Sequence, residues 1–281
     1  MPEFKADFHC HTTMSDGSLT PEELINRAVE YELTHLAITD HDSTKGYEEA
    51  LRFAEQTNIQ LISGVEVSCQ WQKHTIHIVG LEMDVENKQL QEGLERNRQI
   101  RIKRAEAIDE KAKSRFGSLL EKIKPKLKEG MIGRNHFAQE LIAQGIVKDQ
   151  TQAFNKYLKQ GRPLYVPVVW PELDEVVKWI VEAGGIAVIA HPHIYKITKS
   201  KLNKMIVEFK EAGGRAIEVV NQPRVCSEQT GMADRAIRHG LLASQGSDFH
   251  RPEHIWRGLG WLAPMPKGVD PIWNHLKGIK L

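Results

Sequence analysis

Short apolar runs alternate with amphipathic segments along most of the chain. Each run is bounded by polar or turn-forming residues, as is typical of short buried strands. The first four runs cover residues 4–8, 35–39, 59–67 and 75–80. Helical spacing of apolar positions separates the earlier runs, at residues 20–31 and 46–56. The first helix has a clear start signal, because Thr20 precedes Pro21 and Glu23 in a capping-box arrangement.

The same alternation returns in the second half of the chain. Strands are expected at residues 185–190, 216–220 and 241–245, and helices at 171–183, 202–212 and 231–238. A last apolar run, Gly258–Leu262, is expected to close the sheet. The pattern predicts an α/β barrel of about seven β/α units, with no sequence repeat between them.

Residues 87–162 interrupt this alternation and show no strand pattern. Between residues 88 and 130 there are 13 Lys and Arg against 7 Asp and Glu, an excess of six. Two shorter helices are expected at 134–144 and 149–159. We predict a helical insertion at 87–162 between two parts of one barrel, residues 1–86 and 163–281. The basic excess suits either a solvated helix face or a surface that holds an anionic substrate.

The composition narrows the class of protein. With 281 residues, 41% of them hydrophobic, the chain can bury one sizeable core. Its formal net charge of +1 does not require a nucleic-acid partner, and no obligate protein partner is evident. Cys10, Cys69 and Cys226 form no Cys-x-x-Cys pair, which favours a reducing compartment. Without a leader pattern or the ~18 apolar residues of a membrane span, we expect a cytoplasmic protein.

The candidate chemistry begins directly after the first predicted strand. His9 and His11 lie two residues apart, so on an extended backbone both imidazoles point to the same side and can bind one metal ion. Asp16, in the turn that follows, can reach the same place. Alone, this pair is a weak signal, because two surface histidines beside a helix start would look the same. Cys10, between them, is expected to be a small buried side chain.

Further imidazoles and carboxylates collect where other strands end. They are Asp40, His41, Glu66, His191, Asp248 and His250, while His77 lies within a strand. In a parallel β/α barrel these strand ends form one rim, which is where active sites lie. A ligand set of imidazoles and carboxylates without thiolates favours manganese, iron or zinc over calcium. Nine candidate ligands are too many for one ion, so we expect more than one.

These residues resemble the motif set of the PHP (polymerase and histidinol phosphatase) family. The matching segments are His9-x-His11, Asp16-Gly17, Thr39-Asp40-His41, Gly64-x-Glu66, His77, Ala190-His191-Pro192 and Ser247-Asp248-x-His250. The resemblance spans nearly the whole chain. It implies a distorted (β/α)7 TIM-like barrel, two to three divalent ions (manganese first, with iron, zinc or magnesium as alternatives), and phosphoester hydrolysis.

The resemblance also implies a role for each residue of the centre. His9, His11, Glu66 and Asp248 would hold one ion, and Glu66 would bridge to a second ion held by His77 and His191. Asp16, His41 and His250 would hold the third ion. Asp40 is expected to orient a ligand, and His74 to face the other side of its strand.

Within the family, the chain is similar to a branch with a helical insertion that acts on 3′,5′-nucleoside bisphosphates or degrades RNA from its 5′ end. Gly133–Ala138 and Tyr157–Pro167 carry this similarity. It implies that four residues contact the substrate: Arg134, His136, His193 and Tyr195. The chain departs from the branch at three places: Asn135 replaces Pro, Ile194 replaces Arg, and Asn221-Gln222 replaces a small polar pair.

The expected function is therefore metal-dependent hydrolysis of nucleotide phosphate esters. The substrates would be 3′,5′-nucleoside bisphosphates, 5′-phosphorylated short RNA, or both. Metal ions would bind the scissile phosphate and activate a water, so no nucleophilic Ser or Cys is needed. Alternatives are a phosphatase of another small phosphomonoester, such as histidinol phosphate, and an amidohydrolase-like enzyme, although no Lys lies at a strand end. A nucleic-acid-binding module with a degenerate site is a further alternative, against which the complete ligand set argues.

Overall fold

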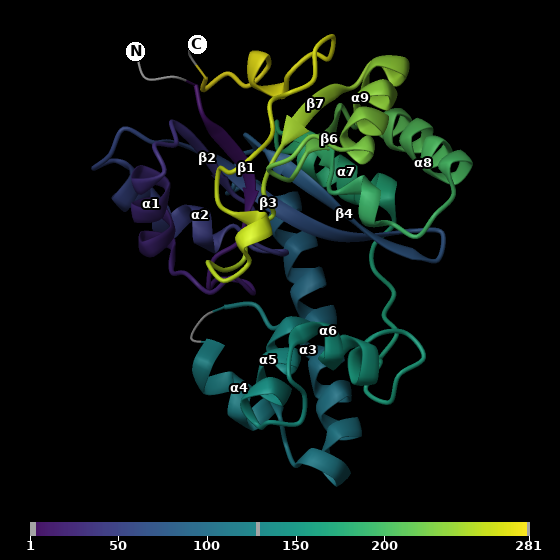
Figure 1. Cartoon of the computed structure of the whole chain (residues 1–281). Helices are drawn as coiled ribbons and strands as arrows, with labels where there is room; N and C mark the ends of the chain where they lie inside the picture. The colour runs from purple at the N-terminus through teal and green to yellow at the C-terminus, as the bar shows by residue number, and fades with distance from the viewer. Residues whose placement is uncertain (1–3, 128–129, 280–281) are drawn as a thin grey trace.

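Seven strands form one sheet that curves into a nearly closed barrel in the computed structural model, which describes residues 4–127 and 130–279 (Figure 1). The strands are β1 (Ala6–Cys10), β2 (His35–Ile38), β3 (Gln60–Trp71), β4 (His74–Leu81), β5 (Ile186–Ile189), β6 (Ala216–Val220) and β7 (Leu242–Gln245). Their order in the sheet follows the chain. The first and last strands meet just beyond their ends, where His11 N donates to Phe249 O at 2.8 Å and Asp248 N donates to His9 O at 2.8 Å.

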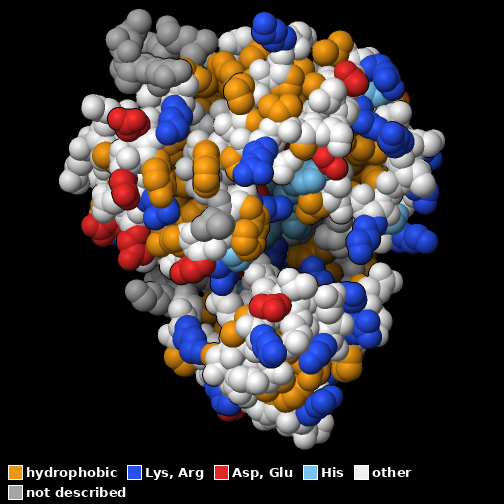
Figure 2. Space-filling view, viewed as in Figure 1, with side chains coloured by type: hydrophobic (Ala, Val, Ile, Leu, Met, Phe, Trp, Pro, Cys, Tyr) orange, Lys and Arg blue, Asp and Glu red, His pale blue; other side chains and the backbone are white. Residues whose placement is uncertain are grey.

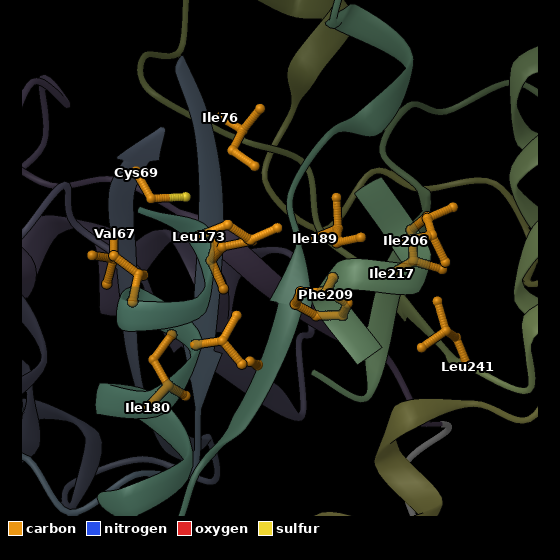
Figure 3. Close-up of a cluster of buried hydrophobic side chains, with 14 of the residues drawn as sticks. Val67, Cys69, Ile76, Leu173, Ile180, Ile189, Ile206, Phe209, Ile217 and Leu241 are labelled. Atoms are coloured by element: carbon orange, nitrogen blue, oxygen red, sulfur yellow. The ribbon is translucent and has the colours of Figure 1, made fainter. Parts of the chain in front are cut away.

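Helices cover the outside of the barrel. They are α1 (Pro21–Glu30), α2 (Lys45–Ala54), α7 (Leu173–Glu182), α8 (Lys199–Glu211) and α9 (Ser227–His239). The largest core lies between β3–β6 and α7–α9, where Ile180 of α7 and Phe209 of α8 are fully buried (Figure 3). Burying each such side chain contributes about 1.5–3 kcal/mol, so this layer holds the strand ends in fixed positions.

The sheet departs from the expected parallel barrel at β4. β3 and β4 form a long antiparallel hairpin, and β4 is antiparallel to β5 as well. Only Gln72 and Lys73 connect the two strands, and Gln72 adopts a φ of 54° in this turn. No helix separates them, as the order of the predicted elements implied, so the alternation of parallel strands and helices is interrupted at this point. His77 consequently lies in the middle of a strand, opposite Ser68 of β3.

The expected closing strand at Gly258–Leu262 does not form. This segment is irregular, and Gly260 adopts a φ of 65° that favours glycine. Its N–H donates to Asp7 Oδ2 at 2.7 Å, and a Cβ built on it would lie 2.4 Å from Leu33. The segment therefore packs against the first strand, and the contact of β7 with β1 closes the barrel instead.

The segment between β4 and α7 is helical, as expected, and extends away from the barrel (Figure 1). It contains α3 (Lys88–Phe116), α4 (Leu120–Leu127), α5 (Arg134–Ala143), α6 (Gln150–Ala153) and a π-helical turn (Phe154–Leu158). The expected helix at 149–159 is thus divided into α6 and this turn. Phe137 and Leu141 lie fully buried in a core that belongs to these helices.

The long helix α3 joins the insertion to the barrel. Its first half packs on α7, where a Cβ on Gly93 would lie 2.5 Å from the Trp179 ring. Residues 1–3 and 128–129, which entered the expectations on a leader and on the basic insertion, lie outside the described residues. Within residues 4–127 and 130–279, no helix combines the length and the apolar character needed to cross a bilayer.

Candidate active site

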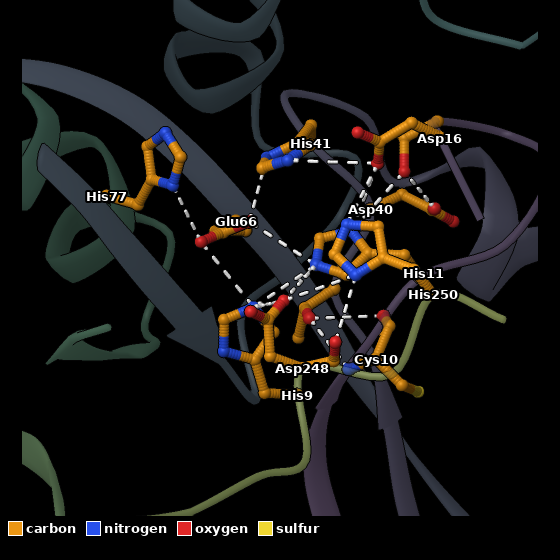
Figure 4. A network of polar contacts seen from close by, with 12 residues as sticks. His9, Cys10, His11, Asp16, Asp40, His41, Glu66, His77, Asp248 and His250 are labelled. Atoms are coloured by element: carbon orange, nitrogen blue, oxygen red, sulfur yellow. Dashed lines mark hydrogen bonds and ion pairs between the residues drawn. The ribbon is translucent and has the colours of Figure 1, made fainter. Parts of the chain in front are cut away.

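Two imidazoles from the end of β1 face each other at the centre of the barrel rim. His9 Nε2 and His11 Nε2 lie 3.2 Å apart, and both side chains are fully buried (Figure 4). On the far side of its ring, His9 Nδ1 lies 2.5 Å from Glu218 Oε1 of β6. In the neutral ring a proton on Nδ1 would be held there by the carboxylate, and Nε2 would then be free to bind a metal ion. Burial alone lowers the pKa of His9, but Glu218 and Glu66 outweigh it and raise the pKa well above its usual value.

Glu66 of β3 lies among five of the expected imidazoles, and His9 Nε2 is 3.5 Å from its Oε1. Its Oε1 is 2.7 Å from His191 Nε2 and 2.9 Å from His77 Nδ1. Its Oε2 is 2.8 Å from His41 Nδ1 and 3.4 Å from His11 Nε2. Burial raises the pKa of Glu66, but the nearby histidines, His77 foremost, lower it well below the usual range. The carboxylate is therefore ionised and presents both oxygens to the centre.

Asp16 and His250 form the other side of the centre (Figure 4). Asp16 Oδ1 lies 3.2 Å from His250 Nε2 and 3.8 Å from His41 Nε2. The ring of His250 stacks on that of His11, with centroids 4.1 Å apart, and Asp248 Oδ1 lies 3.3 Å from His11 Nε2. Burial alone lowers the pKa of His250, but Asp16 and Asp248 raise it to about 9.

The donor atoms fall into three overlapping groups, and within each group they lie within 4.8 Å of one another. The groups are His9, His11 and Glu66; His41, Glu66 and His77; and His11, Asp16, His41 and His250. Asp16 Oδ1 and Glu66 Oε2 are buried and accept no well-directed hydrogen bond among the described residues, although imidazole nitrogens lie 3.2 Å and 2.8 Å from them. A buried carboxylate oxygen left in this state is costly, and a cation relieves the cost. Both the geometry and the thiolate-free donor set fit divalent transition-metal ions.

Asp40 lies beside this centre without facing it. Its carboxylate accepts hydrogen bonds from Thr12 N at 2.8 Å, Thr12 Oγ1 at 2.6 Å and Ser15 Oγ at 2.5 Å. These bonds fix the loop between His11 and Asp16. The geometry agrees with the expectation that Asp40 orients the residues of the centre.

Two other residues lie outside the centre, as expected. Cys10 is buried and its Sγ donates to Ala37 O at 3.2 Å. His74 belongs to none of the three groups, and its ring stacks beside Trp71 with centroids 6.4 Å apart.

A cavity of about 170 Å³, the arginine cavity, adjoins the centre on the side of His41 and His77. Three guanidinium groups line its far wall: Arg101 and Arg104 from α3, and Arg134 from the start of α5. Arg101 Nε donates to Asp42 Oδ2 at 2.6 Å, and this buried pair fixes α3 to the barrel rim.

Arg104 and Arg134 have no hydrogen bond or ion pair among the described residues. Arg104 is only 8% exposed, and its guanidinium lies 5.3 Å from the centroid of the Trp170 ring. Arg134 lies 5.7 Å from the centroid of the Phe154 ring. Burial, followed by the charges of Arg101 and Arg134, lowers the pKa of Arg104 well below its usual value. Because these two guanidinium groups are buried and no described carboxylate forms an ion pair with them, the arginine cavity is suited to bind an anion.

The other expected substrate residues do not line this arginine cavity. His136 Nδ1 accepts a hydrogen bond from Gly133 N at 3.0 Å and so caps α5. The Tyr195 hydroxyl accepts a hydrogen bond from His77 N at 2.9 Å. His193 and Tyr195 line a separate cavity of about 310 Å³. Of the four expected residues, the structure brings only Arg134 to the arginine cavity.

Asn135, where the related branch has proline, connects the insertion to the centre. Its Nδ2 donates to Asp16 Oδ2 at 2.5 Å, and its Oδ1 accepts from Gln150 Nε2 at 2.9 Å. A proline has no side-chain amide, so this contact with a residue of the centre depends on the substitution.

Several of these contacts involve residues that the sequence pattern did not single out. Glu218 lies inside an otherwise apolar strand, and a buried acid there was the available signal. Arg101 and Arg104 are three residues apart in a helix rich in basic residues, so their sequence context did not distinguish them from exposed neighbours.

The fold and this centre agree with a comparison to known families. A family model described as the PHP domain matches residues 7–183. The chain belongs to the PHP family, which is a family of hydrolytic phosphoesterases. The expected family, the expected barrel and the expected class of enzyme are confirmed.

Individual relatives extend over almost the full chain. The chain is 41% identical over 273 residues to the 3′,5′-nucleoside bisphosphate phosphatase of Chromobacterium violaceum, covering 96% of both proteins. It is 39% identical over 271 residues to the 5′-3′ exoribonuclease Rnm of Escherichia coli, covering 95% of this chain and 92% of that protein.

Two solved structures resemble it closely. One is described as an amidohydrolase from Chromobacterium violaceum with bound sulfate and no metal. It has a TM-score of 0.91 and 40% identity, and the match covers 97% of this chain and 96% of that one. The other is assigned as a metal-dependent phosphoesterase from Bifidobacterium adolescentis. It has a TM-score of 0.80 and 27% identity, and the match covers 96% of this chain and 94% of that one.

Proposed function

We propose that the protein is a metal-dependent hydrolase of 5′-phosphorylated nucleotides that breaks the ester bond at their 3′ oxygen. Its substrates are 3′,5′-nucleoside bisphosphates, 5′-phosphorylated short RNA, or both. One observation carries the proposal: a cavity with two unpartnered guanidinium groups adjoins a centre of seven grouped imidazoles and carboxylates, which His191 and Asp248 contact directly. A substrate with two phosphates suits this pair of sites, and the activities named for the relatives agree with it.

Nine side chains would hold two to three divalent ions, manganese foremost. They are His9, His11, Asp16, His41, Glu66, His77, His191, Asp248 and His250. Such ions neutralise the charge on a phosphoryl group and make a water more acidic. Glu66 presents both oxygens and suits a bridging position, which an imidazole cannot take. Asp40 and Glu218 orient the residues around them through hydrogen bonds.

The insertion, residues 87–162, serves as a lid that binds the second phosphate. Arg104 and Arg134 pair with the 5′-phosphate, because a planar guanidinium matches phosphate oxygens with two hydrogen bonds. Arg101 and Asp42 hold α3 in the position that this grip needs. With the 5′-phosphate held there, the 3′-phosphate lies over the centre.

The reaction is a hydrolysis at phosphorus. A water oxygen forms a bond to the 3′ phosphorus, the bond between that phosphorus and the 3′ oxygen breaks, and the 3′ oxygen takes a proton. The products of a bisphosphate are a 5′-mononucleotide and inorganic phosphate. No Lys lines either of the cavities that border the centre within the described part of the chain, so a reaction that uses a lysine at a strand end, as many C–N hydrolases do, is less suited to it.

The free cysteines fit a reducing environment, and we propose that the protein works in the cytoplasm. Cys10 and Cys69 are buried as free thiols, and Cys226 is half-buried and also free.

The role of the arginine cavity is tested with Arg134→Ala. We expect kcat/KM for a 3′,5′-bisphosphate with manganese to fall about tenfold to a hundredfold, since a charged hydrogen bond contributes ~1.5–3 kcal/mol. Hydrolysis of p-nitrophenyl phosphate should hardly change, because this ester has no second phosphate. Arg96→Ala is the matched control, as Arg96 is exposed and pairs with Glu175 away from the cavity.

Equal losses on both substrates would assign Arg134 to the fold or to the scissile phosphate. No loss on either substrate, or activity on a cyclic amide with none on any phosphate ester, would overturn the proposed function.

A further inference from the structure

A third cavity, of about 290 Å³, opens beside the centre next to His250. Its wall consists of Asn135, Gln150, His250, Arg251, His254, Trp256 and Arg257. The arginine cavity begins at His41 and His77, and the two cavities share Asn135, whose amide contacts Asp16. The centre therefore has two exits, one toward the arginines and one toward this third cavity. Figure 2 shows histidines and basic side chains around the hollow between the barrel and the insertion.

The mouth of the third cavity carries an exposed aromatic pair. The rings of His254 and Trp256 are stacked, with centroids 5.2 Å apart and an angle of 19° between their planes. Trp256 is 61% exposed, so most of its indole surface has no partner in the fold. The indole of Trp256 therefore contributes little to the packing of the barrel.

The charges around this pair are mainly positive. Arg251 and Arg257 line the same cavity, and Arg257 also pairs with Asp248 of the centre. Glu253 is the acidic neighbour and is exposed to solvent. Proteins that bind single-stranded nucleic acid combine aromatic faces, on which bases stack, with basic groups that follow the backbone. This cavity offers both within reach of the scissile phosphate.

We propose that His254 and Trp256 form a stacking platform for the base of the nucleotide that follows the scissile phosphate in RNA. The inference rests on the proposed function, which places the 5′-phosphate in the arginine cavity and the 3′-phosphate at the centre. The next nucleotide of an RNA then leaves through the other exit. A 3′,5′-bisphosphate has no such nucleotide and leaves the platform empty. The platform therefore determines how well RNA is used relative to a bisphosphate.

The same bond breaks in both substrates. When the bond from phosphorus to the 3′ oxygen is hydrolysed in RNA, the phosphoryl group remains on the 5′ oxygen of the next nucleotide. This nucleotide is then a new 5′-phosphorylated end, which the arginine cavity can bind. Repeated cleavage from the 5′ end follows from the arrangement of the three sites.

The test is Trp256→Ala, measured on a short 5′-phosphorylated RNA and on a 3′,5′-bisphosphate. For RNA we expect kcat/KM to fall about fivefold to a hundredfold, mainly through KM, as is usual when a stacked base loses its aromatic partner. For the bisphosphate the change should stay below about twofold. Trp256→Phe should restore most of the activity on RNA. Trp261→Ala is the control, because Trp261 is also 61% exposed but lines a different cavity.

Binding gives a second readout that needs no hydrolysis. In chelator-treated protein, a short 5′-phosphorylated RNA should quench more of the tryptophan fluorescence in the wild type and in Trp261→Ala than in Trp256→Ala, where Trp170 of the arginine cavity is the only other described tryptophan near the bound RNA. Equal losses of kcat/KM on both substrates, no loss on RNA, or quenching unchanged by Trp256→Ala would overturn the platform. A wild type that hydrolyses neither substrate overturns the proposed function, and the quenching experiment still decides on the platform.

Discussion

Five imidazoles surround the carboxylate of Glu66, three at Oε1 and two at Oε2. No other type of side chain serves this position well, because an imidazole or an amide cannot present two anionic oxygens. Glutamine has the same shape as glutamate but lacks the charge. Replacing Glu66 by Gln therefore separates the charge of the residue from its size.

For Glu66→Gln we expect loss of bound metal and a fall in kcat of at least ~10²-fold, because a bridging ligand is removed. Metal content is measured by elemental analysis and rate with a phosphate ester and added manganese. His74→Gln is the control, since His74 lies three residues from His77 on the same strand but outside the centre. If His74→Gln is the inactive protein, the assignment of strand faces is wrong.

The gathering of the nine candidate ligands at one place was predictable because each belongs to a short motif with a fixed spacing. Asp40 belongs to such a motif too, and its bonds to the loop between His11 and Asp16 are compatible with the expected orienting role. Glu218, Arg101 and Arg104 were not, because their importance comes from contacts across the fold. Glu218 reaches His9, 209 residues earlier in the chain, and no local pattern reports such a contact.

At the scale of elements, the sequence predicted where a helix starts better than it predicted the direction of the strands. The capping box of α1 is present, with Thr20 accepting from Glu23 N and Glu23 accepting from Thr20 N. The hairpin of β3 and β4 was missed as a hairpin, because a buried apolar run looks the same in parallel and antiparallel strands. The segment at Gly258–Leu262 has an apolar pattern, but it packs on β1 as a loop.

The position of α3 on the barrel depends on a close contact at Gly93. Gly93→Ala adds a methyl group that meets the Trp179 ring at 2.5 Å. Although alanine favours a helix by ~1 kcal/mol, overpacking of this kind costs about 1–3 kcal/mol, so we expect net destabilisation. The midpoint of thermal unfolding should fall by a few degrees, at roughly 2–4 °C per kcal/mol.

Gly231→Ala in α9 is the matched control. The nearest atom to a Cβ there is the flexible end of Arg235, at 3.4 Å. This substitution should stabilise the protein or leave it unchanged. A loss of stability in Gly231→Ala equal to that in Gly93→Ala would show that the contact with Trp179 is not the cause.

At the scale of the whole molecule, the centre joins strands from across the barrel. His9 lies in β1 and His11 directly after it, Glu66 belongs to β3, and His191 and Asp248 follow β5 and β7. Ions bound by all of them would link these strands, and only the folded chain brings the ligands together. Metal binding should therefore stabilise the fold as well as support the reaction.

Removing the metal with a chelator should lower the midpoint of thermal unfolding. An ion present at a hundred times its Kd contributes about 2.7 kcal/mol, and elemental analysis before chelation should give at least two equivalents per chain. A reproducible single equivalent, or a midpoint that chelator does not move, would contradict a centre with several ions.

The effect of chelator should grow between pH 7 and pH 9. In the metal-free protein the pKa of His250 is raised to about 9 from an ordinary value near 6.5. The stability from this shift is complete below pH 6.5 and is lost as pH rises through 9. Over the same pH range, protons compete less with metal for His250. Metal therefore binds more tightly, and the metal-bound protein becomes more stable relative to the metal-free protein. Unfolding scans at both pH values, with and without chelator, measure the difference.

The meeting of β1 with the end of β7 has a consequence for a chain that is still being made. A ribosome that has released residues up to 240 has supplied His9, His11 and Glu66, but neither Asp248 nor His250 exists yet. The pairing of His11 with Phe249 also has to wait. A nascent chain therefore carries an incomplete ligand set until residues 248–250 have been made. If the finished protein cuts RNA, the message being translated is not exposed to a complete centre on its own nascent chain before that point.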